Sequence, residues 1–299
     1  MTTTQPPAPS PARVWLMAAR PATLPAAAAP VLVGTAAAAA VGSFRPLPAL
    51  AALLGALLIQ IGTNYANDYF DFKKGADTAE RIGPTRATQS GLLRPETVRN
   101  GMIATFALAA LVGLYLVAVG GWPILVVGVL SIAAGVLYTG GPWPLGYNGL
   151  GDVFSFVFFG LVAVCGTAYV QAGAVPPLAI LASLPIAALV TAILVVNNLR
   201  DVATDRVAGK RTLAVIFGPG FARAEYAALV VAPYLLLPVI WLAGSATPWV
   251  LLPLLTAPLA VRLVRTMLSE SGPTLNRALK GTGQLELLFG LLLALGLVL

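Results

Sequence analysis

The chain has 299 residues, of which 58% are hydrophobic and only 10% are charged, and its formal net charge is +7. Soluble domains are about 25% charged, so this composition excludes an ordinary soluble domain and places most of the chain where charge is not solvated. Histidine is absent and Cys165 is the single cysteine, which excludes disulfides, cysteine-ligated zinc and histidine acid–base catalysis. The basic excess lies in short loops between apolar segments, which indicates a membrane protein and not a nucleic-acid-binding protein.

The N-terminal segment is rich in proline, and we expect residues 1–12 to be disordered. Arg20 then precedes an apolar, alanine-rich run, a pattern that secretory signal peptides share. The run 22–41 is long enough to cross a membrane, and we therefore interpret it as the first spanning helix.

Further apolar segments follow along the chain, each close to the length of about 20 residues that a spanning helix needs. The nine predicted spans are 22–41, 47–70, 98–119, 121–138, 151–171, 175–200, 222–243, 247–268 and 281–299. The connections at Gly120-Gly121 and between Gln171 and Pro177 are very short, so eight spans is the competing count. We expect one multi-pass, all-α membrane domain over 1–299, with about nine helices around a central cavity.

Charge predicts the orientation of these spans in the cell membrane. Because nine spans alternate sides, 17 of the 18 basic residues fall on one side, and only Arg45 falls on the other. The 17 residues are Arg13, Arg20, Lys73, Lys74, Arg81, Arg86, Arg94, Arg99, Arg200, Arg206, Lys210, Arg211, Arg223, Arg262, Arg265, Arg277 and Lys280. Since basic loops stay in the cytoplasm, we expect a cytoplasmic N-terminus and a C-terminus outside. The acidic residues lie on the same side of the membrane as the basic residues, so we expect the active site to face the cytoplasm.

The second span ends in a group of polar side chains. Asn64, Asn67, Asp68 and Asp71 fall at offsets 0, 3, 4 and 7, which puts four oxygen-bearing side chains on one helical face. Carboxylates at this spacing repel each other unless a cation joins them, and they are costly at the end of a membrane span. Asp77 follows in the next loop.

The sixth span ends in a matching group. Asn197, Asp201 and Asp205 are spaced by four residues and share a face, with Asn198 beside them. Both spans run from the outside inward, so the two groups reach the same membrane depth. This arrangement suggests two four-helix units that meet at a central cavity. The segments 71–97 and 201–221 would be cytoplasmic loops covering the active site.

Two clusters of carboxylate side chains, in a chain without histidine, favour Mg²⁺ as the bound metal. Mg²⁺ prefers oxygen ligands, and substrate phosphate oxygens commonly complete its coordination. Basic side chains close behind could contact a diphosphate. These candidates are Lys73, Lys74, Arg81, Arg86, Lys210 and Arg211. A diphosphate bridged by metal ions would satisfy both sets of charges, and the apolar surroundings suit an isoprenoid tail in the bilayer. Departure of the diphosphate would leave an allylic cation on the isoprenoid, for which Tyr138 and Tyr147 offer electron-rich faces.

These residues resemble the UbiA superfamily of intramembrane aromatic prenyltransferases through two aspartate motifs, Asn67-Asp68-x-x-Asp71 with Asp77, and Asp201-x-x-x-Asp205. Within it the chain is most similar to the 1,4-dihydroxy-2-naphthoate polyprenyltransferases of menaquinone biosynthesis. The stretches that carry this similarity are NDYFDFKKGAD with RIGPTR (67–77 and 81–86), GYNGLGDVFSFVFFG (146–160), NNLRDVATDRVAGKRTLAV (197–215) and ARPATLPAAAAPVLVGTA (19–36).

The resemblance implies Mg²⁺-dependent transfer of a polyprenyl group to the naphthoate, with loss of CO₂ and diphosphate, giving demethylmenaquinone. It implies that Asp68, Asp71, Asp201 and Asp205 are catalytic and hold the metals. Asn67 and Asp77 would support the first cluster, Asp77 as a further metal ligand. The basic residues Arg81, Arg86, Lys210 and Arg211 would meet phosphate or the acceptor carboxylate. Two positions depart from the family pattern: Gly75 stands where the last aspartate of the first motif falls, and Asp152 stands where relatives have Glu.

Two other functions fit part of the pattern. The same reaction could use 4-hydroxybenzoate or homogentisate as the acceptor. Only the stretches 81–86 and 146–160 argue against these two acceptors. A secondary transporter would also have intramembrane Asp and Asn residues and a possible repeat. However, the acidic residues here lie at helix ends and not at the midplane, and the outer face lacks a matching charged gate.

Overall fold

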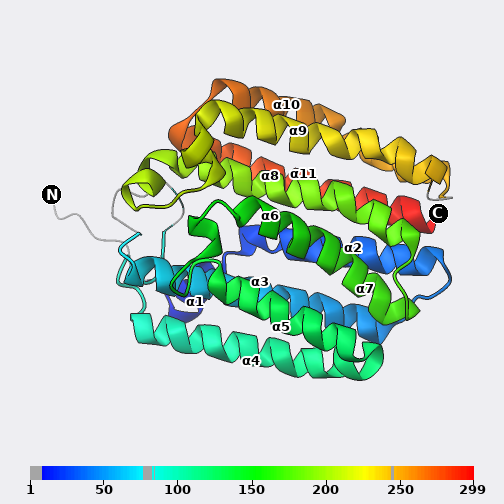
Figure 1. Ribbon diagram of the computed structural model, residues 1–299, viewed down its shortest axis with the longest axis horizontal. Helices are drawn as coiled ribbons and strands as arrows, with labels where there is room; N and C mark the ends of the chain where they lie inside the picture. The colour runs from blue at the N-terminus through cyan, green and yellow to red at the C-terminus, as the bar shows by residue number, and fades with distance from the viewer. Residues whose placement is uncertain (1–8, 77–82, 84, 244–245) are drawn as a thin grey trace.

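The computed structural model describes residues 9–299 with the exception of 77–82, 84 and 244–245. Throughout these described residues every regular element is helical, and the helices lie side by side along the long axis of the molecule (Figure 1). In chain order they are α1 (Pro11–Ala19), η1 (Pro21–Thr23), α2 (Pro25–Ala40), α3 (Pro46–Lys73), α4 (Pro95–Gly120), α5 (Trp122–Leu137), η2 (Leu145–Tyr147), α6 (Gly151–Ser155), η3 (Phe156–Val162), α7 (Ala163–Ala172), α8 (Pro177–Val207), α9 (Leu213–Ala243), η4 (Pro248–Thr256), α10 (Ala257–Ser269), η5 (Gly272–Thr274) and α11 (Leu275–Val298).

The structure confirms the all-α membrane fold and a count close to nine spans. Seven helices are long and apolar enough to cross a membrane, and the bent pair Pro11–Thr23 and Pro25–Ala40 forms an eighth candidate. The one remaining predicted span, 121–138, corresponds to α5, which has 16 residues and is therefore roughly 24 Å long. The segment 151–171 is one continuous helix whose middle, η3, is a π-helix.

The first span differs from the prediction because the chain bends by 53° between η1 and α2. Helix α1 already begins at Pro11, inside the segment expected to be disordered, whereas residues 1–8 lie outside the described part. Arg20 joins α1 to η1 with φ 52°, the one positive value among the described non-glycine residues. Such a conformation costs free energy and is often found at functional sites.

The helices around the acidic clusters continue further than hydropathy predicts. α3 runs to Lys73 and α8 to Val207, so the first turns of the segments expected as loops at 71–97 and 201–221 are helical. The reason is that a hydropathy window ends at the first charges, while backbone hydrogen bonding continues until a residue stops it. Gly75 and Gly209, with φ of 67° and 73°, provide these stops.

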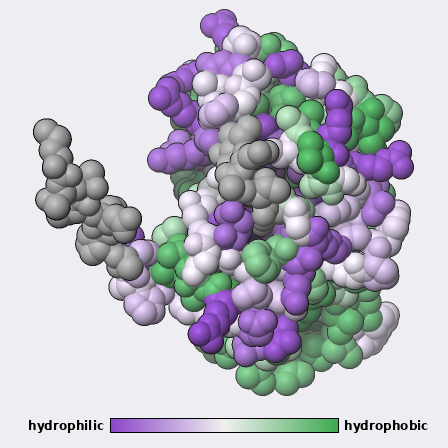
Figure 2. Space-filling view, turned by 90° about the vertical axis from the view of Figure 1, so that its left-hand side faces the viewer, coloured by the Kyte–Doolittle hydropathy of each residue, from purple (hydrophilic) through white to green (hydrophobic). Residues whose placement is uncertain are grey.

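The packing is organised around α3 and α8. α3 packs against α4, and α8 packs against α9, α11 and α2. A large apolar core surrounds α8, and a smaller one joins α1, α3 and α4 to the segment around Ala87. In Figure 1 the loops that follow α3 and α8 lie at one end of the bundle, and the C-terminus lies at the other. Figure 2 shows that hydrophilic side chains gather over the end with these two loops.

Candidate active site

One cavity of about 1010 Å³ lies inside the helical bundle and contains most of the predicted site residues. Its wall along α3 changes in character with depth. Nearest the polar end are Asp71 and Asn67, then Asn64 and Gln60, and then the apolar residues Ile59, Ala56, Gly55 and Ala52. The cavity therefore has a charged mouth, a neutral polar middle and an apolar interior.

The polar face of α3 is held by neighbouring segments. Asn67 Oδ1 accepts a hydrogen bond from the Thr139 hydroxyl at 2.9 Å. Asn64 Nδ2 donates to the Ala19 carbonyl and to Thr23 Oγ1, both at 2.9 Å. Asn64 therefore fixes the bend between α1 and α2 while still lining the cavity.

Asp68 and Asp71 are three residues apart and both are buried, yet their surroundings differ. Asp68 does not line the cavity. Its Oδ2 accepts the Ala87 N–H at 3.0 Å, and its Oδ1 accepts the Thr88 N–H at 3.2 Å. This carboxylate holds the segment that follows Arg86, and both of its oxygens are engaged by backbone donors.

Asp71 lines the cavity and is surrounded by cationic and hydroxyl groups. Arg86 Nη2 lies 3.0 Å from its Oδ2, in an ion pair with little solvent access. Tyr147 donates its hydroxyl to Asp71 Oδ1 at 2.7 Å, and Lys210 Nζ lies 3.5 Å from the same oxygen. Desolvated charges need such partners, and these contacts offset the burial of the Asp71 carboxylate.

On α8, Asp201 is neutralised by its sequence neighbour. Arg200 Nε donates to Asp201 Oδ1 at 2.8 Å and Arg200 Nη2 to Oδ2 at 2.6 Å, a bidentate pair. The same guanidinium donates to Asn197 Oδ1 at 2.8 Å and to Asn276 Oδ1 of α11 at 2.9 Å. Arg200 thus connects the second cluster to α11.

The two predicted clusters meet at Lys210. Its Nζ lies 3.5 Å from Asp71 Oδ1 and 3.8 Å from Asp205 Oδ1. Asp201, Asp205, Asn197 and Asn198 also line the cavity. The ends of α3 and α8 therefore face one another across a single site, as their matching depth predicted.

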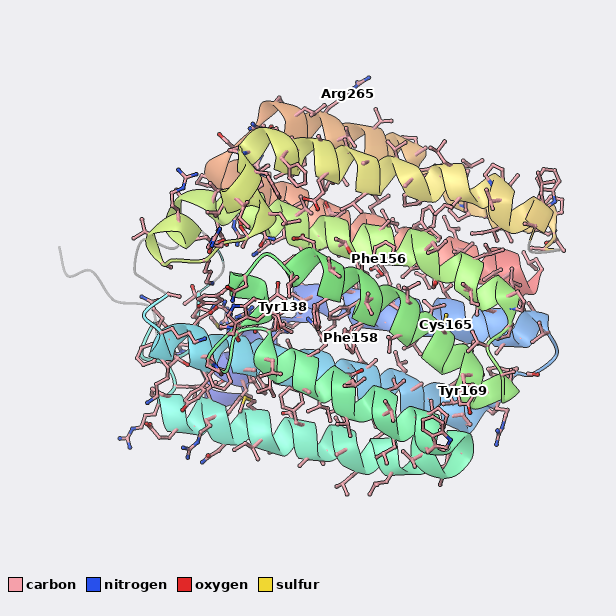
Figure 3. All side chains as sticks on the ribbon, in the orientation of Figure 1. Tyr138, Phe156, Phe158, Cys165, Tyr169 and Arg265 are labelled. Carbon is pink, nitrogen blue, oxygen red and sulfur yellow. The ribbon has the colours of Figure 1, made fainter. Side chains whose placement is uncertain are left out.

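Tyr138 lies at the cavity wall between the charged mouth and the apolar interior. A Cβ at Gly146 would lie 2.9 Å from Tyr138 Cε1, and one at Gly151 would lie 3.0 Å from the Tyr138 hydroxyl, so both glycines make room for this ring. Figure 3 shows Tyr138 toward the end of the bundle with the clusters, and Phe158 deeper in the molecule. Phe158 stacks on Phe154 with ring centroids 5.7 Å apart, and both line the cavity.

Some of the predicted residues do not reach the cavity. Lys73 is exposed, with Nζ 6.0 Å from the Tyr69 ring centroid, and Arg211 is exposed and contributes its backbone N–H to the Tyr147 carbonyl at 2.9 Å. Neither side chain is part of the cavity wall. Asp77 and Arg81 lie outside the described residues.

The structure adds polar residues that spacing did not predict. Arg20 and Gln60 line the cavity, and Gln60 Nε2 donates to Thr23 Oγ1 at 3.0 Å. Lys280 and Asn276 of α11 line it as well. Arg200 was missed because adjacent residues on a helix do not share a face, and only its long side chain brings it back to Asp201. Arg20 lies in the stretch 19–36, whose resemblance to the family was the one feature of the sequence that could have indicated a role for Arg20.

The side chains present fit Mg²⁺ by their chemistry. Asp71, Asp201, Asp205 and Asn67 offer only oxygen donors, which is the ligand type that Mg²⁺ takes. Within the described part of the chain, however, no three acidic side chains come close enough to form a metal site by themselves. Lys210 holds the position between Asp71 and Asp205. Oxygens from a bound anion would therefore be needed to complete the coordination.

Comparison with known proteins gives a consistent result across nearly the whole chain. The model of the UbiA prenyltransferase family matches residues 27–295. The 1,4-dihydroxy-2-naphthoate octaprenyltransferase of Escherichia coli (strain K12) is 42% identical over 288 residues, which cover 93% of this chain and 94% of that protein. The protein of the same name from Mycobacterium tuberculosis is 42% identical over 281 residues, covering 94% and 95%.

A solved structure shares the fold. A UbiA homolog from Archaeoglobus fulgidus bound to GPP and Mg²⁺ matches with a TM-score of 0.67 at 17% identity, covering 95% of this chain and 99% of that chain. At this identity the match concerns the arrangement of the helices.

Proposed function

The chain belongs to the UbiA prenyltransferase family, and we propose that it transfers a polyprenyl group from a polyprenyl diphosphate to 1,4-dihydroxy-2-naphthoate, with loss of CO₂ and diphosphate. The product is the quinol form of demethylmenaquinone. The observation that carries this function is the meeting of Asp71 and Asp205 at Lys210, at the mouth of a cavity whose interior is apolar. Relatives named for this reaction, 37% to 42% identical, support the choice of acceptor.

The charged mouth of the cavity would hold the diphosphate. Asp71, Asp201 and Asp205 would ligate Mg²⁺, and Arg86 and Lys210 would contact phosphate oxygens once those ions enter. Mg²⁺, when bound, would neutralise the charge that develops on the departing diphosphate. Asp68 would act through the backbone of Ala87 and Thr88, since both of its oxygens are already engaged there.

The apolar interior would hold the prenyl chain. It is lined by Gly113 and Val117 of α4, Leu125 and Gly128 of α5, and Val162 of η3. No charged side chain is among these, so the chain can be buried without desolvating an ion. Tyr138 lies at the boundary between the two regions, where the reacting carbon of an allylic diphosphate would be.

The reaction balances without a protein base. The bond between C1 of the prenyl group and the bridging oxygen breaks, and the electron pair leaves with the diphosphate. The naphthoate ring forms the new carbon–carbon bond, and its carboxylate leaves as CO₂, returning its bonding electrons to the ring. Net exchange of a prenyl cation for CO₂ needs no proton, which is consistent with a chain that contains no histidine.

We also propose that the charged mouth faces the cytoplasm, with the N-terminus on the same side and the C-terminus outside. The distribution of basic residues supports this orientation. Water-soluble naphthoate and released diphosphate would then exchange on one side, while the prenyl chain enters from the bilayer.

An assay of the purified protein in detergent tests the function. The protein is supplied with Mg²⁺, a series of polyprenyl diphosphates and 1,4-dihydroxy-2-naphthoate, with 4-hydroxybenzoate and homogentisate in parallel, and products are identified by mass spectrometry. We expect a prenylated, decarboxylated naphthoquinol from the naphthoate alone. Product from another acceptor would change the assigned substrate, and the lack of any product from folded protein would favour a transporter.

A further inference from the structure

Tyr147 contacts Asp71 of the first aspartate cluster and two nearby lysines, Lys74 and Lys210. It ends η2 in the connection between α5 and α6. Its hydroxyl donates to Asp71 Oδ1 at 2.7 Å. Its ring centroid lies 4.8 Å from Lys210 Nζ and 5.0 Å from Lys74 Nζ. Its carbonyl accepts the Arg211 N–H at 2.9 Å, which ties it to the loop after α8.

The two lysines beside this ring carry like charges, and the charge of Lys210 acts on the Lys74 ammonium. Lys74 Nζ donates to the Thr139 carbonyl at 2.8 Å and to the Gly141 carbonyl at 3.2 Å. Burial lowers the pKa of the Lys74 ammonium, and the nearby Lys210 charge lowers it further, while the Asp71 carboxylate acts in the opposite direction. An aromatic face attracts ammonium groups and so offsets part of this repulsion.

An ammonium group held at the cavity mouth can contact a phosphate oxygen. Lys210 lines the cavity, while Lys74 lies behind Tyr147 and outside the cavity wall. The ring of Tyr147 therefore contacts one lysine that faces the diphosphate mouth, Lys210, and a second that lies outside the cavity wall, Lys74. This differs from the sequence-based interpretation, in which its face would stabilise the prenyl cation.

We propose that Tyr147 is a positioning residue with two separable parts, a hydroxyl that orients Asp71 and a ring that seats Lys210 for the diphosphate. This inference rests on the proposed function for the identity of the anion. It assigns the ring to anion binding and the hydroxyl to the metal requirement, so each part has its own measurable effect.

The test compares Tyr147→Phe, which keeps the ring, with Tyr147→Leu, which removes it. Binding of inorganic pyrophosphate in the presence of Mg²⁺ is measured by calorimetry on detergent-solubilised protein. We expect Tyr147→Leu to bind about fivefold to tenfold more weakly, as for the loss of a cation–π contact, and Tyr147→Phe to bind like the unchanged protein. Unchanged binding by Tyr147→Leu, or equal weakening in both variants, would overturn the role of the ring.

The hydroxyl is tested by the Mg²⁺ concentration that gives half-maximal turnover. Tyr147→Phe should need about threefold more Mg²⁺, since a single hydrogen bond to a charged group is lost. An unchanged requirement would overturn the role of the hydroxyl. Tyr169→Leu is the matched control, because Tyr169 donates to the Gly120 carbonyl at the opposite end of the bundle (Figure 3) and should affect neither measurement.

The pyrophosphate measurement is independent of the acceptor. If the unchanged protein forms no naphthoate product but Tyr147→Leu binds pyrophosphate more weakly than Tyr147→Phe, the proposed function fails and the assignment of the ring stands. If it forms the product and Tyr147→Leu binds pyrophosphate normally, the assignment of the ring fails alone.

Discussion

At the scale of single residues, Asp68 and Asp71 show how neighbours decide the role of a carboxylate. Both belong to the same helical face and both are about 1% exposed. Asp68 receives two backbone N–H donors, whereas Asp71 receives a guanidinium, an ammonium and a phenol. Backbone donors cannot move away to admit a cation, but side chains can. Asp71 is therefore the better metal ligand of the two.

Substitution of the two carboxylates by amides separates these roles. We expect Asp71→Asn to raise the Mg²⁺ concentration for half-maximal turnover at least about tenfold. Asp68→Asn should lower kcat about threefold to tenfold through the loss of one backbone hydrogen bond, with the Mg²⁺ requirement within twofold of the original. Equal shifts of the Mg²⁺ requirement in both variants would show that Asp68 is also a ligand.

At the scale of elements, α3 and α8 end in the same way. The Ala76 N–H donates to the Asp71 carbonyl at 2.9 Å, and the Lys210 N–H donates to the Asp205 carbonyl at 2.9 Å. In each case a glycine with positive φ lies between donor and acceptor, Gly75 or Gly209. This shared ending places Asp71 and Asp205 at equivalent positions. It also explains why glycine, and not a third aspartate, stands at position 75.

The π-helix η3 positions the aromatic wall of the cavity against α8, and Gly160 allows the contact. A Cβ at Gly160 would lie 2.5 Å from Ala187 Cα and 3.0 Å from Ala187 N, so alanine there would push the two helices apart. At Gly166, one helix later, a Cβ would meet nothing within 4 Å. The two glycines thus form a matched pair for testing this packing.

Gly160→Ala should destabilise the protein by about 1–3 kcal/mol through overpacking, while Gly166→Ala should change stability by less than about 0.5 kcal/mol. The measurement is the midpoint of thermal inactivation in detergent. An equal midpoint for the two variants would mean that η3 is not held tightly against α8.

At the scale of the whole molecule, the distribution of charged side chains agrees with the direction in which the helices run. The clusters and their loops lie at one end of the bundle, and the C-terminus lies at the other (Figure 1). Hydrophilic side chains are spread over the end with the clusters, with apolar areas between them (Figure 2). The orientation proposed above, with this end in the cytoplasm, rests on the positive-inside rule.

Cysteine labelling tests this orientation in a Cys165→Ala background. Phe44→Cys places a thiol on the connection between α2 and α3, and Ser271→Cys places one between α10 and α11, at exposed positions near opposite ends. We expect a membrane-impermeant maleimide to label Phe44→Cys in intact spheroplasts and Ser271→Cys only after lysis. The reverse pattern would mean that the active site faces outward.

The sequence by itself determined the membrane class, the helical spans and the residue types of the two clusters. These properties are local: apolar length decides whether a helix can span, and spacing by three or four decides which side chains share its face. The stretch from Asn64 to Asp71 and the stretch from Asn197 to Asp205 could therefore be identified without a structure.

Only the tertiary structure decided which of these side chains act together. Lys210 reaches Asp71 from the loop after α8, Arg200 reaches Asn276 of α11, and Asp68 points to the backbone at Ala87 and away from the cavity. Each of these contacts depends on how helices are rotated and how loops return between them. Such information lies in the packing of distant segments, which local spacing does not contain.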